Sequence, residues 1–133
     1  MYKEEELKCL ESYLLNFNFK TKVLRTRKTI IAKKLGFPKL YFVFTDIGIL
    51  ITNMLKLNEE AEKRKLNVLK FINELNQKTK ISKYYLEQNN ILISEAIVKY
   101  IVDEQDFQEL IAVLYYDMFQ TLKDNKKTIN FIN

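Results

Sequence analysis

The stretch ISKYYLEQNNILISEAIV, residues 81–98, decides the fold. Residues 81–87 are rich in aromatic and aliphatic side chains that favour a pleated strand. Gln88-Asn89-Asn90 follows, and asparagine tolerates the left-handed conformation that a tight turn requires. From residue 91 to 102 the side chains alternate between two faces, as they do in a strand. The stretch therefore predicts an antiparallel hairpin with strands over 81–87 and 91–102.

A helix is predicted on either side of this hairpin. Asn58 is a suitable N-cap for a helix over 58–76, because acidic residues follow it in the first turn. Asp103 caps the last helix, whose apolar residues recur at helical spacing, namely Phe107, Leu110, Ile111, Leu114, Met118 and Leu122. A third helix is predicted over residues 3–16, with its leucines gathered on one side.

The first half of the chain adds strands over 19–24, 28–34, 40–45 and 49–54. Thr45-Asp46-Ile47-Gly48 is typical of a tight reversal in which Gly48 takes a positive φ. Strands and helices do not alternate regularly, which argues against a doubly wound parallel sheet. We expect an α+β fold with an antiparallel sheet of about five strands flanked by helices, in the order α-β-β-β(-β)-α-β-β-α.

Length and composition favour one globular unit. The chain has 133 residues, 47% of them hydrophobic, so it can bury a core without disulfides. We expect a single domain over residues 1–124. Residues 125–133 are a polar tail with Ile129, Phe131 and Ile132, and they either stay loose or add a short strand.

Residues 69–122 carry a family resemblance. The helix end Phe71-Ile72-Asn73-Glu74-Leu75-Asn76, the strand after it, the Asn89-Asn90 turn and Ile91-Leu92-Ile93-Ser94 resemble the YbjN-like proteins, linked by name to bacterial sensory transduction. The resemblance implies a fold similar to that of type III secretion chaperones, and the family has no established enzyme activity. The residue type and position of Asn73 and Asn76 favour a capping role at the helix C-terminus, through free carbonyl groups or a left-handed φ, over a ligand-binding role.

Few residues suited to catalysis are present. The sequence contains no His, the usual general base and metal ligand, and only two Gly, so neither a zinc site nor a phosphate loop is expected. The one cysteine, Cys9, is expected to be a buried thiol. The last helix begins with three acidic residues, Asp103, Glu104 and Asp106. Their interaction with the helix dipole explains them better than a cation site does. We expect no enzyme activity, cofactor or metal, and a cytoplasmic protein, because neither a signal peptide nor a membrane span is evident.

Charge is distributed unevenly. Between Asn18 and Thr45 there is no acidic residue, whereas the charged residues over 81–124 are eight acidic residues and only three lysines. The basic patch consists of Lys20, Lys22, Arg25, Arg27, Lys28, Lys33 and Lys34, with Lys39 close by in the sequence. It either binds an acidic protein or nucleic acid, or keeps an exposed sheet edge solvated.

Tyr115, Tyr116 and Phe119 widen the apolar face of the last helix. They are either core residues or an exposed patch for a partner or a second copy. We expect a non-enzymatic protein-binding module acting as a chaperone, adaptor, regulator or small inhibitor of a larger machine, for example one encoded by a mobile element. The alternatives are a nucleic-acid-binding protein that uses the basic strands 20–39 and, less favoured, an enzyme that uses carboxylates alone.

Overall fold

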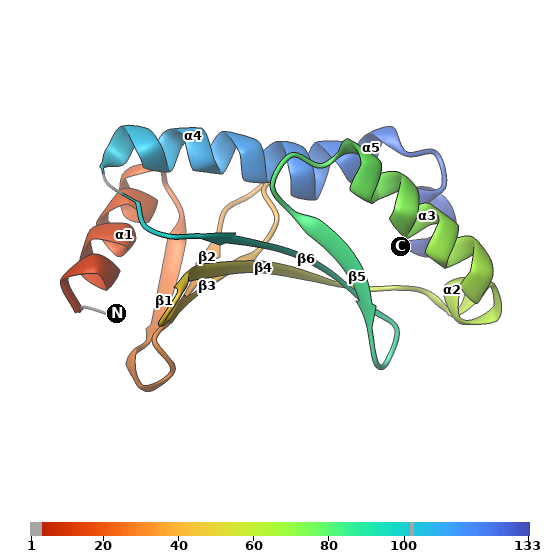
Figure 1. Cartoon of the computed structure of the whole chain (residues 1–133), viewed down its shortest axis with the longest axis horizontal. Helices are drawn as coiled ribbons and strands as arrows, with labels where there is room; N and C mark the ends of the chain where they lie inside the picture. Colours follow the sequence, from red (N-terminus) through yellow and green to blue (C-terminus); the bar gives the residue numbers. More distant parts are fainter. Residues whose placement is uncertain (1–3, 102) are drawn as a thin grey trace.

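A computed structural model describes residues 4–101 and 103–133. Six antiparallel strands form one curved sheet in the spatial order β1-β2-β3-β4-β6-β5 (Figure 1). The α+β class is confirmed, with six strands where about five were expected. The strands are β1 (Lys20–Leu24), β2 (Thr29–Lys33), β3 (Leu40–Thr45), β4 (Gly48–Lys56), β5 (Lys83–Glu87) and β6 (Ile91–Val98).

Two turns have the conformations that the sequence predicts. Asn89 and Asn90 join β5 to β6 with φ values of 64° and 62°. Gly48 begins β4 with φ at 151°, and a Cβ atom there would lie 2.4 Å from the carbonyl oxygen of Val98. The sharp β3–β4 turn therefore depends on a residue without a side chain.

Helices cover one face of the sheet (Figure 1). Asn58 and Asp103 are N-caps as predicted, because their side chains accept hydrogen bonds from the backbone N–H groups of Ala61 (3.1 Å) and Asp106 (2.8 Å). The helices are α1 (Glu4–Asn16), α2 (Glu59–Lys63), α3 (Lys65–Lys78), α4 (Glu104–Tyr115), α5 (Thr121–Asp124) and α6 (Thr128–Phe131), with a 3₁₀ turn η1 (Arg25–Arg27) and a π-helical turn η2 (Tyr116–Gln120).

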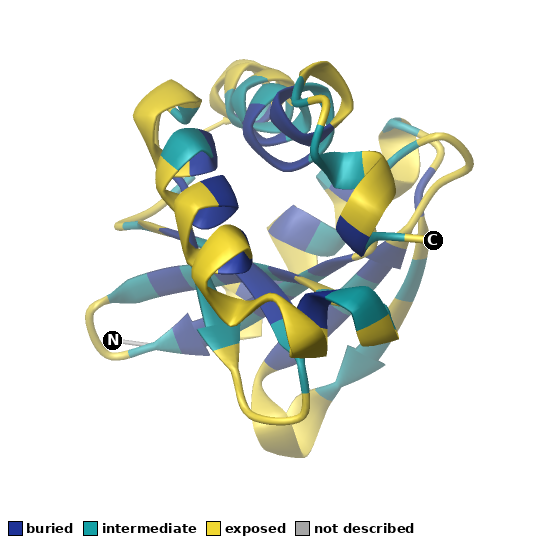
Figure 2. Ribbon diagram, turned by 90° about the vertical axis from the view of Figure 1, so that its right-hand side faces the viewer, coloured by how far each residue is buried: buried dark blue, intermediate teal, exposed yellow. Residues whose placement is uncertain are grey.

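The core has two clusters between the helices and the sheet. Figure 2 shows buried residues on the faces where helices and sheet meet. One cluster packs α1 and α4 on β2, β3 and β4, with Phe42 and Phe107 fully buried. The other packs α3 and α6 on β5 and β6 around Phe71 and Leu92.

Four expectations about single elements were wrong. The helix expected over 58–76 is divided at Arg64, whose φ and ψ of −124° and 52° are not helical, and it continues to Lys78. The strand expected over 91–102 ends at Val98. Cys9 is exposed, because α1 buries the stripe formed by Leu7, Leu10 and Leu14.

The fourth concerns residues 125–133. They contain the helical turn α6 instead of a loose tail or a strand. Its Phe131 is buried with its ring centroid 5.5 Å from that of Phe71. The Phe131 carbonyl also accepts a hydrogen bond from the Asn58 N–H at 2.9 Å, which fixes α6 beside the start of α2.

Asn76 has a different role from the predicted helix cap. Its Nδ2 donates to the backbone carbonyl of Tyr84 at 3.0 Å, and its Oδ1 accepts from the Tyr84 N–H at 2.7 Å. The side chain therefore binds the outer edge of β5. The end of α3 is formed by Thr79, whose N–H donates to the Leu75 carbonyl.

Candidate functional site

Phe37 lies at the centre of a row of aromatic rings that joins the β2–β3 loop to the long C-terminal helix. Its ring centroid is 5.2 Å from that of Phe19 and 5.2 Å from that of Tyr115. Tyr115 in turn lies 4.9 Å from Phe119, one helical turn further on. Gly36, with φ at 76°, turns the chain so that Phe37 can reach these rings.

Three surface hollows meet at Phe37. The first, the apolar hollow, has a volume of about 630 Å³ and is lined by Met54, Leu55, Met118, Phe119, Leu122 and Ile132 among others. The second, the lysine hollow, has about 670 Å³ and is lined by Asn18, Lys20, Lys33, Lys34, Leu35 and Lys39. The third, the α4 hollow, has about 520 Å³ and includes Phe17, Phe19, Ile111 and Tyr115. We call the residues that line these three hollows the Phe37 surface.

The Phe37 surface carries charge of one sign. Its charged lining residues are five exposed lysines, Lys20, Lys33, Lys34, Lys39 and Lys123, and none of its lining residues is acidic. The Lys34 Nζ lies over the Phe19 ring, 5.4 Å from its centroid. The Lys39 Nζ lies over the Tyr41 ring, 5.1 Å from its centroid. Cations over aromatic faces and apolar hollows together favour a ligand that is both acidic and apolar.

The apolar hollow borders an incompletely paired part of the sheet. Pairing between β3 and β4 ends at Tyr41–Thr52, whereas β4 continues beside β6 as far as Lys56. Residues 53–56 therefore have a neighbouring strand on one side only. The Asn53 Nδ2 donates to the Lys39 carbonyl at 2.8 Å and fixes the point where the β2–β3 loop leaves the sheet.

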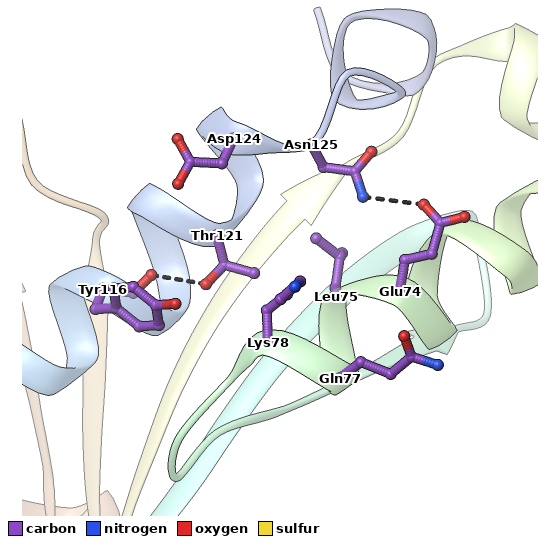
Figure 3. A pocket seen from close by; sticks show the side chains of 8 residues that line it. All are labelled: Glu74, Leu75, Gln77, Lys78, Tyr116, Thr121, Asp124 and Asn125. Atoms are coloured by element: carbon purple, nitrogen blue, oxygen red, sulfur yellow. Dashed lines mark hydrogen bonds between the residues drawn. The ribbon is translucent and has the colours of Figure 1, made fainter.

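The structure separates the three aromatic residues that the sequence analysis grouped. Tyr115 and Phe119 belong to the Phe37 surface, and both are half-buried. Tyr116 instead lines a polar hollow of about 450 Å³, together with residues of α3 and α5 (Figure 3). There the Lys80 Nζ lies 5.0 Å from the Tyr116 ring centroid.

The basic patch is also distributed over separate places. Lys20, Lys33 and Lys34 line the lysine hollow. Lys22 is two residues after Lys20 on β1 and therefore on the same face of the sheet, opposite to the helices, but it does not line this hollow. Arg25, Arg27 and Lys28 lie in the β1–β2 connection at the other end of these strands, where Arg25 forms an ion pair with Glu4.

A buried carboxylate holds the helix that carries the aromatic rings. Asp117, which is fully buried in η2, accepts hydrogen bonds from three consecutive backbone N–H groups, those of Lys80 (2.8 Å), Ile81 (2.9 Å) and Ser82 (2.8 Å). The Tyr84 hydroxyl donates to the Asp117 carbonyl at 2.6 Å, and burial raises the pKa of this phenol. The loop before β5 and the turn between Tyr115 and Phe119 are thereby fixed together.

Sequence reasoning missed Phe37 and Asp117 as site residues. Phe37 had a local signal in the sequence. Gly36 and Pro38 on either side of it indicate a turn, and Phe37 is a large aromatic residue within that turn. Asp117 had only an indirect one, its position beside Met118 on the inward face of an apolar helix. Its partners come from a distant loop that the sequence does not identify.

The acidic residues at the start of α4 have structural partners. Asp103 caps the helix, and Glu104 accepts a hydrogen bond from the Asn16 side chain at 2.9 Å. Over residues 4–101 and 103–133, no three His, Cys, Asp or Glu side chains gather as metal ligands would. Nor does any helix in these ranges have the length and apolar character needed to cross a bilayer.

Comparison with known proteins adds a fold relationship. No family model matches the sequence, and no curated protein matches it significantly. The structure matches the crystal structure of YbjN from E. coli, provisionally described as a transcription regulator, with a TM-score of 0.68 and 12% sequence identity. The match covers 86% of this chain and 87% of YbjN. The chain therefore has the YbjN-like fold that the Asn-turn hairpin and its flanking helices predicted.

Proposed function

We propose that this protein is a non-enzymatic, cytoplasmic protein-binding module that acts as an adaptor, chaperone, regulator or small inhibitor of a larger machine. The observation that carries the proposal is the Phe37 surface, where three hollows with apolar and aromatic walls meet beneath five lysines. Apolar hollows with aromatic anchors and a charged rim are typical of protein interfaces.

Two features favour a protein partner over nucleic acid at this surface. The walls of the apolar hollow include Met54, Leu55, Met118, Leu122 and Ile132, whose aliphatic and thioether side chains suit Leu or Phe side chains better than sugar and phosphate. Residues 53–56 of β4, paired on one side only, also offer backbone hydrogen bonds to an extended peptide. The YbjN fold relationship is compatible with a regulatory role for such binding.

Photo-crosslinking tests the proposal directly. A photoreactive phenylalanine analogue replaces Phe37 in one sample and the exposed Ile47, in the β3–β4 turn, in a control. We expect illumination of cells that naturally make the protein to yield a discrete crosslinked protein at position 37 and none at position 47. Equal crosslinking at both positions, or none at either, contradicts the proposal.

The nucleic-acid alternative rests on the lysine hollow, where four cations surround the exposed Leu35. It predicts binding of single-stranded DNA or RNA that weakens steeply as salt rises, because phosphate contacts release counterions. Fluorescence anisotropy at low salt measures this, with K33E/K34E as the test variant and K63E/K70E, on α2 and α3, as the control. Equal loss in both variants indicates only non-specific attraction.

A further inference from the structure

The two edge strands of the sheet differ in how their outer sides are covered. β1 and β5 lie at the two ends of the strand order (Figure 1). At β5 the Asn76 side chain bonds both the N–H and the carbonyl group of Tyr84, which closes the centre of that edge. An uncovered edge presents N–H and carbonyl groups that can pair with another chain. The outward side of β1, which we call the β1 edge, therefore decides whether the sheet can be extended.

The direction of the backbone groups along β1 follows from the pairing of its neighbours. The Phe44 N–H donates to the Lys28 carbonyl at 2.9 Å, so the even-numbered residues of β2 bond to β3. The odd-numbered residues of β2 then bond to β1, and their partners there are Lys20, Lys22 and Leu24. Thr21 and Val23 consequently point their N–H and carbonyl groups outward, where no hydrogen bond within residues 4–101 and 103–133 occupies them.

The two faces beside the β1 edge differ in chemistry. Lys20 and Lys22 are exposed on the face of the sheet opposite to the helices. Thr21 is on the other face, where its hydroxyl donates to the Glu11 carboxylate of α1 at 3.5 Å. Leu15 follows Glu11 by one helical turn on the same side of α1, and it is 53% exposed. One face thus offers cations, and the other offers an uncovered leucine.

Lysines at an exposed edge can also serve only to keep other strands away. Two features favour binding over that role. The first is the pairing of Lys20 with Lys33, which adds a third cation to the face that carries Lys22 and makes it attractive to acidic side chains. The second is Leu15, because an edge that is only solvated does not need an exposed apolar side chain beside it.

We propose that the β1 edge binds an extended segment of a partner protein, in which acidic and apolar residues alternate, as an additional antiparallel strand. Antiparallel pairing matches the rest of the sheet and is slightly more stable per residue than parallel pairing. The segment's residues opposite Thr21 and Val23 exchange backbone hydrogen bonds with them and direct apolar side chains towards α1. Its residues opposite Lys20 and Lys22 direct acidic side chains towards the lysines.

This proposal rests on the proposed protein-binding function and adds a second contact to it. Lys20 lines the lysine hollow as well as the β1 edge, so the edge is continuous with the Phe37 surface. A partner bound at the Phe37 surface can therefore continue along β1. The two proposals fail separately, because crosslinking at position 37 tests the Phe37 surface and the peptide experiment below tests only the β1 edge.

Nuclear magnetic resonance titration of the full chain with the capped peptide Ser-Leu-Glu-Leu-Glu-Ser tests the β1 edge. In the free protein we expect fast hydrogen exchange at the N–H groups of Thr21 and Val23, and slower exchange at that of Lys22, which faces β2. The peptide should shift the resonances of Thr21 and Val23 and slow their exchange. The peptide Ser-Leu-Leu-Glu-Glu-Ser should bind roughly tenfold more weakly, because its apolar and acidic side chains do not separate onto two faces.

Methylation of single peptide nitrogen atoms separates strand pairing from the attraction of charges. In the antiparallel arrangement the N–H groups of both leucines point at β1, whereas that of the glutamate between them points away. N-methylation of either leucine should therefore weaken binding roughly tenfold or more. The same modification of the glutamate between them should leave the affinity nearly unchanged.

Charge reversal on the protein completes the test. K20E/K22E should weaken peptide binding roughly tenfold or more, and K63E/K70E, on α2 and α3, should leave it unchanged. Circular dichroism checks that both variants are folded. The proposal is overturned by an absence of binding at millimolar peptide, by resonance shifts confined to other surfaces, or by equal effects of N-methylation at leucine and glutamate. If crosslinking at position 37 still succeeds in that case, the proposed function stands without this additional strand.

Discussion

Replacing Asp117 by Asn isolates the contribution of one buried charge to this fold. The change keeps the size of the side chain but gives it one acceptor oxygen instead of two. In the native protein Oδ1 accepts from the Lys80 N–H, and Oδ2 accepts from those of Ile81 and Ser82. The amide NH₂ group in the variant must point at one of these N–H donors, and that donor loses its partner.

The expected loss of stability follows from these three contacts. A hydrogen bond to a charged group contributes about 1.5–3 kcal/mol, and a neutral one about 1 kcal/mol. The variant loses one hydrogen bond, and its other two are made to a neutral group. Part of this loss of free energy is offset, because the variant no longer buries a charge. We expect the free energy of unfolding to fall by about 2–4 kcal/mol. The melting temperature should then fall by about 10 °C.

Urea unfolding followed by circular dichroism measures the loss, and an unchanged m-value shows that the variant unfolds from the same native state. Asp124→Asn is the matched control, because Asp124 is exposed seven residues further along the chain and should change stability by less than about 0.5 kcal/mol. The amides of residues 80–82 should also lose hydrogen-exchange protection in Asp117→Asn. Equal stability of the two variants would refute the assignment of this carboxylate as a structural anchor.

Three other changes test separate contacts. Asn76→Ala removes both hydrogen bonds to the Tyr84 backbone and should cost about 1–2 kcal/mol in urea unfolding, whereas Asn73→Ala on the same helix should be nearly neutral. Gly48→Ala should cost at least about 2 kcal/mol and lower the thermal midpoint, because its Cβ overlaps a β6 carbonyl at 2.4 Å. Burial raises the pKa of Tyr85 to about 12, so the stability it contributes is complete below pH 10 and lost as pH rises through 12. Absorbance titration of wild type and Tyr85→Phe should differ by one phenol that ionises near pH 12, and identical alkaline curves contradict this.

Features encoded by neighbouring residues could be predicted from the sequence. The Asn89-Asn90 turn, the Asn58 cap and the Gly48 reversal each depend on a few adjacent residues, and all three are present. Together with the periodic spacing of apolar residues, these three features were sufficient to predict the α+β class. The ends of helices and strands were predicted less accurately. For example, Arg64 interrupts a helix, and no Gly or Pro in the sequence marks the break.

The candidate site could be predicted only in part, because it depends on contacts between distant segments. Tyr115 and Phe119 were identified from the helix pattern, but the ring that joins them to the basic segment, Phe37, comes from a loop far away in the sequence. The basic patch was contiguous in sequence but is divided in space, because Arg25, Arg27 and Lys28 lie in the β1–β2 connection, at the opposite end of these strands from Lys20 and Lys33. Only the three-dimensional structure shows which lysines of the basic patch line the lysine hollow.

The Asn76 side chain also bears on how this protein avoids aggregation. Its amide presents a carbonyl and an N–H to Tyr84 as a peptide group would, so a single helical residue substitutes for a neighbouring strand. Exposed edge strands can template the growth of intermolecular sheets, and a strand whose central hydrogen bonds are already occupied is a poor template. Another chain could extend the sheet at β5 only by first displacing this side chain.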